Sequence, residues 1–252
     1  MINGKIMVAI PGQGRLKKEF LAACSAADLV FDQPDDRNDR AVLRDRKNEL
    51  PDIDIVVAKP GTAMFYMQNG IVDCAVMGQD SVTEARCAAR EQDTALPGEV
   101  MDAMNIGRCK MVIAAPEDDS VYTAINLEGK RIATVYPSLL RAWLKANGVE
   151  NATVVDQLDG GTETAVTFGL ADAICEIEQS GKSLISNGLE RKLELFNVSA
   201  VFVRTNNDIG ADNQEILSRL VKRLKSAVEI VQDNAPAAIN VVTPRASVPM
   251  RA

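Results

Sequence analysis

Histidine is absent from this 252-residue sequence. Without an imidazole the chain can form no Ser–His–Asp triad, no histidine general base and no histidine metal ligand, which excludes many hydrolases and most catalytic zinc sites. The sequence also lacks an apolar run of about 18 residues, the length that a membrane-spanning helix needs. Its first residues lack the apolar region of a signal peptide. We therefore expect a cytoplasmic protein without a membrane partner.

Cysteine pairs at a metal-binding or redox spacing are missing as well. The five cysteines are widely spaced and form no C-x-x-C motif, so we expect free, mostly buried thiols in a reducing compartment. Acidic residues outnumber basic ones, which gives a formal net charge of −7. This argues against nonspecific nucleic-acid binding, which needs a basic surface. A small anionic substrate remains compatible with such a chain, since positive sites can be local.

Apolar runs of strand length alternate with helical patterns along the chain. The runs predicted to be strands are residues 5–10, 53–58, 72–77, 109–115, 131–135, 152–156, 172–177 and 199–204. The longest helical pattern, residues 213–232, places Leu217, Leu220 and Leu224 on one face. This alternation indicates an α/β fold with largely parallel strands.

Three local features refine this expectation. Ser138 is a good N-cap for a helix that follows it, and Gly148 stands where the end of that helix favours a left-handed residue. The segment 32–51 is polar and charged, so we expect it to be a surface loop or a mobile flap.

Two segments begin to match nucleotide-binding motifs and then fail. Residues 12–14 start like a dinucleotide-binding fingerprint, but Lys17 stands where the third glycine is needed. Residues 181–183 look like the end of a Walker A loop, but Glu176 occupies the position of its first glycine. We expect neither a Rossmann cofactor site nor a P-loop.

A strand–loop–helix unit in residues 172–189 carries groups that could hold a phosphate. Ser180 and Ser183 offer hydroxyls, Gly181 lets a ligand approach the backbone closely, and Lys182 adds positive charge. The loop amides and the start of the helix would favour an anion. Glu176, at the end of the strand, or Glu178 could accept hydrogen bonds from ribose hydroxyls. An ordinary turn between a strand and a helix would have a similar sequence.

A second glycine-rich segment precedes this unit. Gly160 and Gly161 come directly before Thr162 and Glu163 at an expected helix start. Exposed backbone amides there could bind a diphosphate, and Glu163 could act near a metal–diphosphate. A plain turn explains a lone glycine-rich loop equally well.

The two segments together resemble the signature region of the ATP phosphoribosyltransferase family. That region has a Glu, a Gly six residues later, a strand, an acidic residue and a Ser/Thr-Gly-x-Thr-Leu loop. The matching residues are Glu163, Gly169, Ala171, Ile174, Glu176, Ser180, Gly181, Ser183 and Leu184. Ser183 replaces the usual Thr and keeps its hydroxyl.

Other stretches agree with this family in the same order. They are residues 129–137 (Gly-Lys-Arg-Ile-Ala-Thr-x-Tyr-Pro), 70–80 (Gly-x-x-Asp, then Gly-x-Asp) and 14–16 (Gly-Arg-Leu). Two departures lie in the first part of the chain. Gly12 or Gln13 stands where the family usually has Lys, and Lys59, Pro60 and Gly61 lack the acidic residue that often follows the second strand.

The resemblance implies a two-lobed α/β fold like that of type II periplasmic binding proteins, with a ligand cleft between the lobes. The first lobe, on the acceptor side, would comprise residues 1–106 and 195–252, and the second, on the phosphoribosyl-donor side, residues 107–194. It also implies the short form of the family, without a C-terminal regulatory domain. A separate regulatory subunit and a homo-oligomeric assembly are the partners expected of that form.

The activity implied is a glycosyltransferase (pentosyltransferase) reaction: phosphoribose moves from phosphoribosyl diphosphate (PRPP) to a ring nitrogen of ATP, and diphosphate leaves. This is the first step of histidine biosynthesis, and Mg²⁺ would assist it. The residues implied to bind PRPP are Gly160, Gly161, Thr162, Glu176, Ser180, Gly181, Lys182 and Ser183. Those implied on the ATP-binding side are Arg15, Asp80, Arg131 and Tyr136. Glu163 and Glu176 are the catalytic candidates, and Glu163 is a weak metal ligand that would act mainly through PRPP.

Two alternatives stay open, and the departures near Gly12 and Gly61 favour the first of them. One is a related phosphoribosyltransferase whose acceptor is a different nucleotide or a heteroaromatic compound. The other is a non-enzymatic two-lobed binding protein, which the intact donor loop and the missing signal peptide disfavour.

Overall fold

The computed structural model describes residues 5–35, 38–119, 121, 123–158 and 160–233, with side chains as far as residue 229. Within this part of the chain ten strands form one sheet in the order β2-β3-β4-β1-β5-β10-β6-β9-β7-β8. The strands are β1 (Met7–Ile10), β2 (Leu29–Asp32), β3 (Arg40–Asp45), β4 (Ile53–Val57), β5 (Cys74–Gly78), β6 (Gly98–Pro116), β7 (Arg131–Thr134), β8 (Thr153–Val155), β9 (Ala173–Glu178) and β10 (Leu189–Thr205). The helices are α1 (Gly14–Ala26), α2 (Pro60–Gln68), α3 (Gln79–Glu91), the short 3₁₀ helix η1 (Ala124–Leu127), α4 (Pro137–Ala146), α5 (Thr162–Thr167), α6 (Lys182–Ser186) and α7 (Ala211–Asp233).

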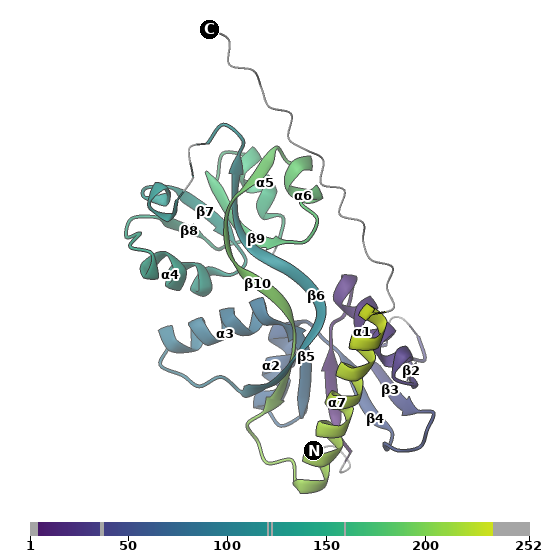
Figure 1. Ribbon diagram of the computed structural model, residues 1–252. Coiled ribbons are helices and arrows are strands. Elements are labelled where there is room, and N and C mark those ends of the chain that lie inside the picture. The colour runs from purple at the N-terminus through teal and green to yellow at the C-terminus, as the bar shows by residue number, and fades with distance from the viewer. Residues whose placement is uncertain (1–4, 36–37, 120, 122, 159, 234–252) are drawn as a thin grey trace.

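Two long antiparallel strands, β6 and β10, run side by side through the whole molecule (Figure 1). At one end β10 pairs with β5, and at the other end β6 pairs with β9. We call the elements around the first end, β1–β5 with α1–α3 and α7, the β1 half. The elements around the other end, β7–β9 with η1 and α4–α6, are the β9 half. The ladder between β6 and β10 shifts register at four points, and such bulges let a long ribbon bend and twist.

Parallel pairing is confined to each half. Strands β4, β1 and β5 are parallel neighbours, as are β9, β7 and β8. The pairs that join the halves, and the hairpin-like pairs of β2 and β3, are antiparallel. The predicted largely parallel sheet is therefore a mixed sheet with two parallel portions.

The central strands of each half are buried on both faces. In β1, Val8 and Ile10 face a core shared with α1 and α7, whereas Met7 and Ala9 face a core shared with α2 and α3. This is the alternation that a strand imposes, and full burial explains why β1 reads as a continuous apolar run. The core of the β9 half is built in the same way around Ile132 of β7 and its neighbours.

The prediction that residues 32–51 form a loop or flap is wrong. Most of the segment is ordered, and its β3 strand pairs antiparallel with both β2 and β4. Ala41, Leu43 and Asp45 alternate inward along β3, so the strand signal was present but was masked by the charged residues between them. Residues 36 and 37 lie outside the described part of the chain.

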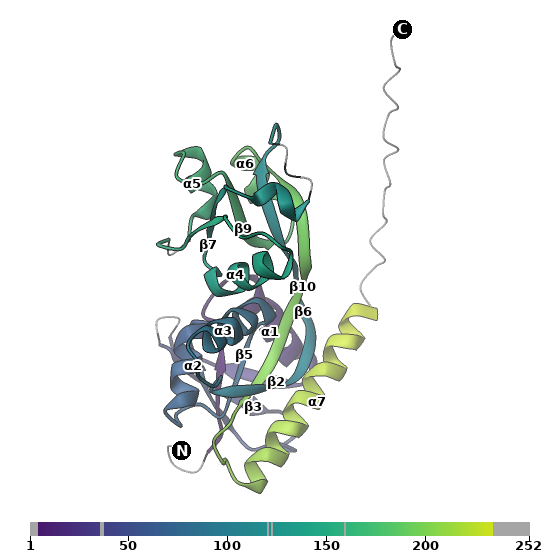
Figure 2. The same ribbon diagram turned by 90° about the vertical axis from the view of Figure 1, so that its left-hand side faces the viewer.

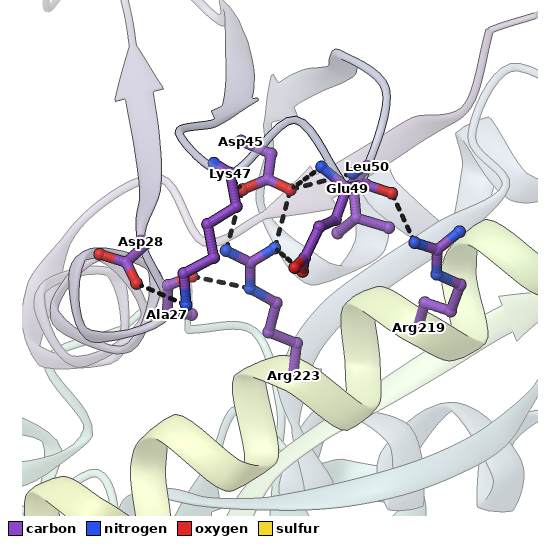
Figure 3. A network of polar contacts seen from close by, with 8 residues as sticks. All are labelled: Ala27, Asp28, Asp45, Lys47, Glu49, Leu50, Arg219 and Arg223. Atoms are coloured by element: carbon purple, nitrogen blue, oxygen red, sulfur yellow. Dashed lines mark hydrogen bonds and ion pairs between the residues drawn. The ribbon is translucent and has the colours of Figure 1, made fainter.

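Asp45 anchors α7 to the end of β3 (Figure 3). Its carboxylate accepts hydrogen bonds from two nitrogens of Arg223, both at 2.8 Å, and from the backbone amides of Lys47, Glu49 and Leu50. Burial alone would raise the pKa of Asp45, but these donors outweigh it and hold the pKa well below its usual value. Arg223 also donates to the carbonyl of Ala27, so one side chain joins α7 to two loops.

The start of α4 differs from the prediction in one detail. The helix begins at Pro137 with Tyr136 as its N-cap, so the expectation that Ser138 is the N-cap is wrong. Proline is well suited to the first helical position because its missing N–H needs no partner there. Gly148 adopts the predicted left-handed conformation, with φ of 73°.

Candidate active site

One cavity of about 500 Å³ lies where the two halves face each other. On the side of the β1 half it is lined where the parallel strands β1, β4 and β5 end, by Pro11, Ala58 and Gly78. On the side of the β9 half it is lined by the end of β9 and the loop into α6. Ligands of parallel α/β sheets bind beyond the carboxyl ends of the strands, and this cavity has that position.

Seven of the residues that the sequence singled out line this cavity. They are Arg15, Asp80, Glu163, Ser180, Gly181, Lys182 and Ser183. The other candidates are Gly160, Gly161, Thr162, Glu176, Arg131 and Tyr136, and none of them is among its described lining residues. Segments more than 100 residues apart in sequence, such as those of Arg15 and Lys182, therefore meet at one site.

The loop between β9 and α6 positions two hydroxyls at the cavity. Gly181 has φ of 70°, and a Cβ there would lie 3.0 Å from Oε1 of Glu178, so the turn favours glycine. Ser183 donates a hydrogen bond of 2.6 Å to Oε1 of Glu163, which ties the first turn of α6 to the first turn of α5. Within the described part of the chain, the ammonium group of exposed Lys182 has no partner.

Gly160 and Gly161 place the start of α5. Both have positive φ, and Gly161 is the N-cap of the helix. The turn buries Thr162 and directs Glu163 into the cavity. The glycines thus act on the site through the two residues that follow them.

Glu176 lies behind the loop and has an unusual environment. Burial raises the pKa of Glu176 to about 7. A hydrogen bond from the backbone of Ile177 lowers this pKa, and the nearby charge of Glu163 raises it further. Oε1 accepts that backbone N–H at 2.8 Å, and Oε2 accepts the hydroxyl of Thr162 at 3.3 Å. Near neutral pH this carboxyl group is poised between its protonated and ionised forms.

Arg15 and Glu19 of α1 bind the backbone of β6 where that strand passes between the halves. The guanidinium of Arg15 contacts Glu19 at 3.0 Å and donates to the carbonyl of Arg108 at 2.7 Å. Glu19 also accepts the N–H of Gly107 at 2.6 Å. Gly107 has φ of 67°, a left-handed conformation that favours glycine, and it packs beside Leu16 of α1. Sequence reasoning missed Glu19, although its i,i+4 spacing from Arg15 was a usable signal.

Tyr136 reaches the site indirectly. Its hydroxyl donates a 2.7 Å hydrogen bond to Oδ2 of Asp80, which is only 6% exposed. Burial and the adjacent Asp80 raise the pKa of Tyr136, which keeps the phenol protonated as a donor. A Cβ on Gly78 would lie 2.1 Å from the Asp80 carboxylate, so the Gly-x-Asp motif is a steric requirement.

Arg131 lies away from the cavity, at the amino end of β7. Its guanidinium contacts Asp172 at 2.7 Å and donates to the carbonyl of Gly169, also at 2.7 Å. Since ligands approach the carboxyl ends of the strands, this geometry favours a structural role for Arg131.

Two departures from the family pattern fall on the cavity wall. Of the two residues that stand where the family usually has lysine, Gly12 or Gln13, Gln13 lines the cavity, and Pro60 lines it in the segment that lacks the acidic residue. Glu178 and Ile177 also line the cavity. Sequence reasoning did not single out Ile177, because nothing distinguishes it from other apolar residues in a strand.

Solved structures show the class of fold. A chain of the ATP phosphoribosyl transferase (HisG:HisZ) complex from Thermotoga maritima matches with a TM-score of 0.65 at 21% identity, covering 89% of this chain and 99% of that one. The periplasmic aliphatic sulphonate binding protein SsuA from Escherichia coli matches with 0.58 at 12% identity, covering 91% and 74%. The alkanesulfonate-binding protein SsuA from Xanthomonas axonopodis pv. citri, bound to MOPS, matches with 0.56 at 14% identity, covering 91% and 75%. The predicted α/β fold of the periplasmic-binding-protein type is confirmed.

The family follows from the sequence itself. Residues 59–226, two thirds of the chain, match the family model of HisG, ATP phosphoribosyltransferase. The chain belongs to this family, whose enzymes are glycosyltransferases that transfer phosphoribose to ATP in histidine biosynthesis and act with a metal ion. The predicted family and enzyme class are confirmed. No helix in the described residues is long and apolar enough to cross a membrane.

Proposed function

We propose that the cavity binds PRPP against the β9 half and ATP against the β1 half, and transfers phosphoribose between them. The acceptor lobe would be residues 1–106 and 195–252, and the donor lobe residues 107–194. The observation that carries this proposal is that Ser183, joined to Glu163, and Arg15, joined to β6, line one and the same cavity.

The donor side has the chemistry of a phosphate site. Ser180 and Ser183 present hydroxyls, and the ammonium of Lys182 is free among the described groups. We assign the 5′-phosphate of PRPP to these residues and the backbone of Gly181. Glu176 would contact the ribose hydroxyls, and residues 160–163 would lie near the diphosphate.

The acceptor side suits a nucleotide. Within the described residues, α1 starts at Gly14, its N-cap Gln13 makes no side-chain capping hydrogen bond, and its first turn has no acidic residue, so its amides favour an anion. Arg15 adds positive charge at the same place, and Pro11, Ala58 and Pro60 offer an apolar surface for a flat base. Asp80 would accept a hydrogen bond from the acceptor.

We propose Mg²⁺ as the metal ion. Among the described residues, no group of three or more His, Cys, Asp or Glu side chains could hold a metal. Two carboxylates, those of Glu163 and Glu178, line the cavity from the donor side, and Mg²⁺ commonly binds through one or two carboxylates plus substrate phosphates. Glu163 would help to hold the ion, which would supply positive charge to stabilise the leaving diphosphate.

The reaction requires positioning more than a protein nucleophile. The bond from C1′ of the ribose to diphosphate breaks as a bond from C1′ to the acceptor nitrogen forms, through a transition state with positive charge on the ribose. Ordered donor and acceptor subsites supply proximity, and the carboxylates of Glu163 and Glu176 supply negative charge near the ribose. Tyr136 and Glu19 would hold Asp80 and Arg15 in place.

We also propose a cytoplasmic location, a homo-oligomeric assembly and a separate regulatory subunit. The similarity in fold to a chain of the Thermotoga maritima HisG:HisZ complex supports the regulatory partner.

Two substitutions test the placement of the substrates. Ser183→Ala should raise the dissociation constant of PRPP, measured with Mg²⁺ by calorimetry, about 2- to 12-fold, the effect of losing one hydrogen bond. Ser186→Ala is the matched control, because this serine of α6 donates to the carbonyl of Lys182 and does not line the cavity. Arg15→Ala should weaken ATP binding and leave PRPP binding unchanged. An effect of Arg15→Ala on PRPP alone would reverse the assignment of the two sides.

A further inference from the structure

Glu178 places a negative charge inside the proposed donor site. It is the last residue of β9, and its side chain lines the cavity beside Ser180 while being only 14% exposed. Its Oε1 lies 3.0 Å from where a Cβ on Gly181 would be, so the carboxylate packs directly against the loop. A carboxylate beside a bound phosphate disfavours binding unless another group compensates its charge.

Arg191 supplies the compensating charge from the next strand. Its Nη1 contacts Oε2 of Glu178 at 2.9 Å. Arg191 does not line the main cavity but a second pocket of about 350 Å³ that shares Glu178, Gln179 and Ser180 with it. The loop therefore has the main cavity on one side and Arg191 on the other.

The second pocket concentrates positive charge in an acidic chain. Arg108, Lys110 and Arg191 line it, although the net charge of the chain is −7. Lys110 lies opposite Glu178 in the ladder of β6 and β9, but its ammonium contacts Glu194 at 2.6 Å. Among the described residues of this pocket, Arg191 is therefore the cation that forms an ion pair with Glu178.

We infer that Arg191 is a positioning residue of the donor site, which cancels the charge of Glu178 and fixes the orientation of its carboxylate against the loop. Arg191 itself does not contact PRPP. The inference rests on the proposed binding of the donor phosphate at residues 180–183. The alternative hypothesis is that Arg191 and Glu178 form an ordinary half-exposed ion pair, whose removal would leave PRPP binding almost unchanged.

A charge-rescue experiment separates these readings. The dissociation constant of PRPP with Mg²⁺ is measured by calorimetry for the wild type, Arg191→Gln, Glu178→Gln and the double variant, with thermal unfolding as a check on folding. Arg191→Gln should weaken PRPP binding about tenfold, as expected for one uncompensated charge. The double variant should return to within about twofold of the wild type, because the charge that needed compensation is gone. The deficit of Arg191→Gln should shrink as salt is added.

Two further variants make the outcome decisive. Lys110→Gln removes a cation from the same pocket whose ammonium is paired with Glu194, and it should change PRPP binding less than about twofold. Wild-type affinity in folded Arg191→Gln, or a double variant as weak as Arg191→Gln, would overturn the inference. If Ser183→Ala also leaves PRPP binding unchanged, the donor placement itself has failed and the inference falls with it. If Ser183→Ala weakens binding and Arg191→Gln does not, only the role of Arg191 is refuted.

Discussion

Tyr136 donates its hydroxyl hydrogen to Asp80 at 2.7 Å, and this contact joins the two halves of the molecule at the edge of the cavity. It belongs to a larger contact between α3 and α4, which face each other in Figure 2. Glu84 of α3 accepts the first free backbone amides of α4, those of Ser138 and Leu139, at 3.0 and 2.7 Å. A carboxylate from one half thus caps a helix of the other, which satisfies its unpaired amides and complements its dipole.

Tyr136→Phe tests the contribution of this contact to acceptor binding. The change removes the donor and leaves the buried carboxylate of Asp80 with a long contact of 3.3 Å from Ser81. We expect a loss of stability of about 1–3 kcal/mol and weaker binding of ATP, with PRPP binding nearly unchanged. Calorimetry with each ligand and urea unfolding measure these effects.

Tyr66→Phe is the control for this change. It removes a hydroxyl from α2 that has no partner among the described residues, so both properties should stay at wild-type values. Unaltered ATP binding in Tyr136→Phe would show that the hydrogen bond from Tyr136 to Asp80 does not contribute to acceptor binding.

The raised pKa of Glu176 predicts how stability depends on pH. The folded pKa is about 7, above the usual value near 4.5, so the folded state binds the proton more tightly than the unfolded state. This contribution to stability is present below about pH 4.5 and is lost as pH rises to 7, with a slope of at most about 1.4 kcal/mol per pH unit. Glu176→Gln should remove that slope, and the difference between the two proteins isolates it.

The pH dependence of unfolding can support or contradict the raised pKa of Glu176. Urea unfolding of wild type and Glu176→Gln between pH 4.5 and 8 should give curves that diverge as pH rises, with the wild type losing more stability. Parallel curves would mean that Glu176 titrates at an ordinary pKa, and its assignment to a buried position behind the loop would be wrong.

Arg223 is predicted to matter for stability and not for substrate binding. Arg223→Ala leaves the Asp45 carboxylate, 1% exposed, with backbone donors but no cation, which should cost about 3 kcal/mol in free energy of unfolding. Arg219→Ala, one turn earlier on α7, removes only a contact with the carbonyl of Glu49 and should cost less than about 1.5 kcal/mol. PRPP and ATP affinities should be unchanged in both, because none of these residues lines the cavity. Equal losses in the two variants would contradict the role of the Asp45 network.

The sequence was sufficient for the parts of the fold that depend on local pattern. Continuous apolar runs identified β1, β4, β5 and β9, because strands that are buried on both faces carry few polar residues. The left-handed conformation of Gly148 was also predictable, since a left-handed helix end has a local chemical requirement. The loop of residues 180–183, which lines the cavity, was singled out by its hydroxyls, a glycine and a cation within four residues.

The remainder depended on contacts that are distant in sequence. The first half of β6, around residues 98–106, is mixed in polarity and becomes a strand because β10 pairs with it. The sequence placed Tyr136 with the acceptor-side residues, but its hydrogen bond to Asp80, 56 residues away, could not be predicted from any local pattern. The pairing of Glu178 with Arg191 likewise follows from the position of β10 beside the loop, which no local pattern indicates.

The most direct test of the account is product formation from PRPP and ATP with Mg²⁺ by the purified chain, followed by chromatography of the nucleotide product and by release of diphosphate. The account predicts phosphoribosyl-ATP and diphosphate in equal amounts, with no release when ATP is omitted. Ser183→Ala should slow both at low PRPP, and Arg15→Ala should slow both at low ATP. Absence of PRPP binding, or diphosphate release that proceeds equally without ATP, would contradict the assignment of this cavity to ATP phosphoribosyl transfer.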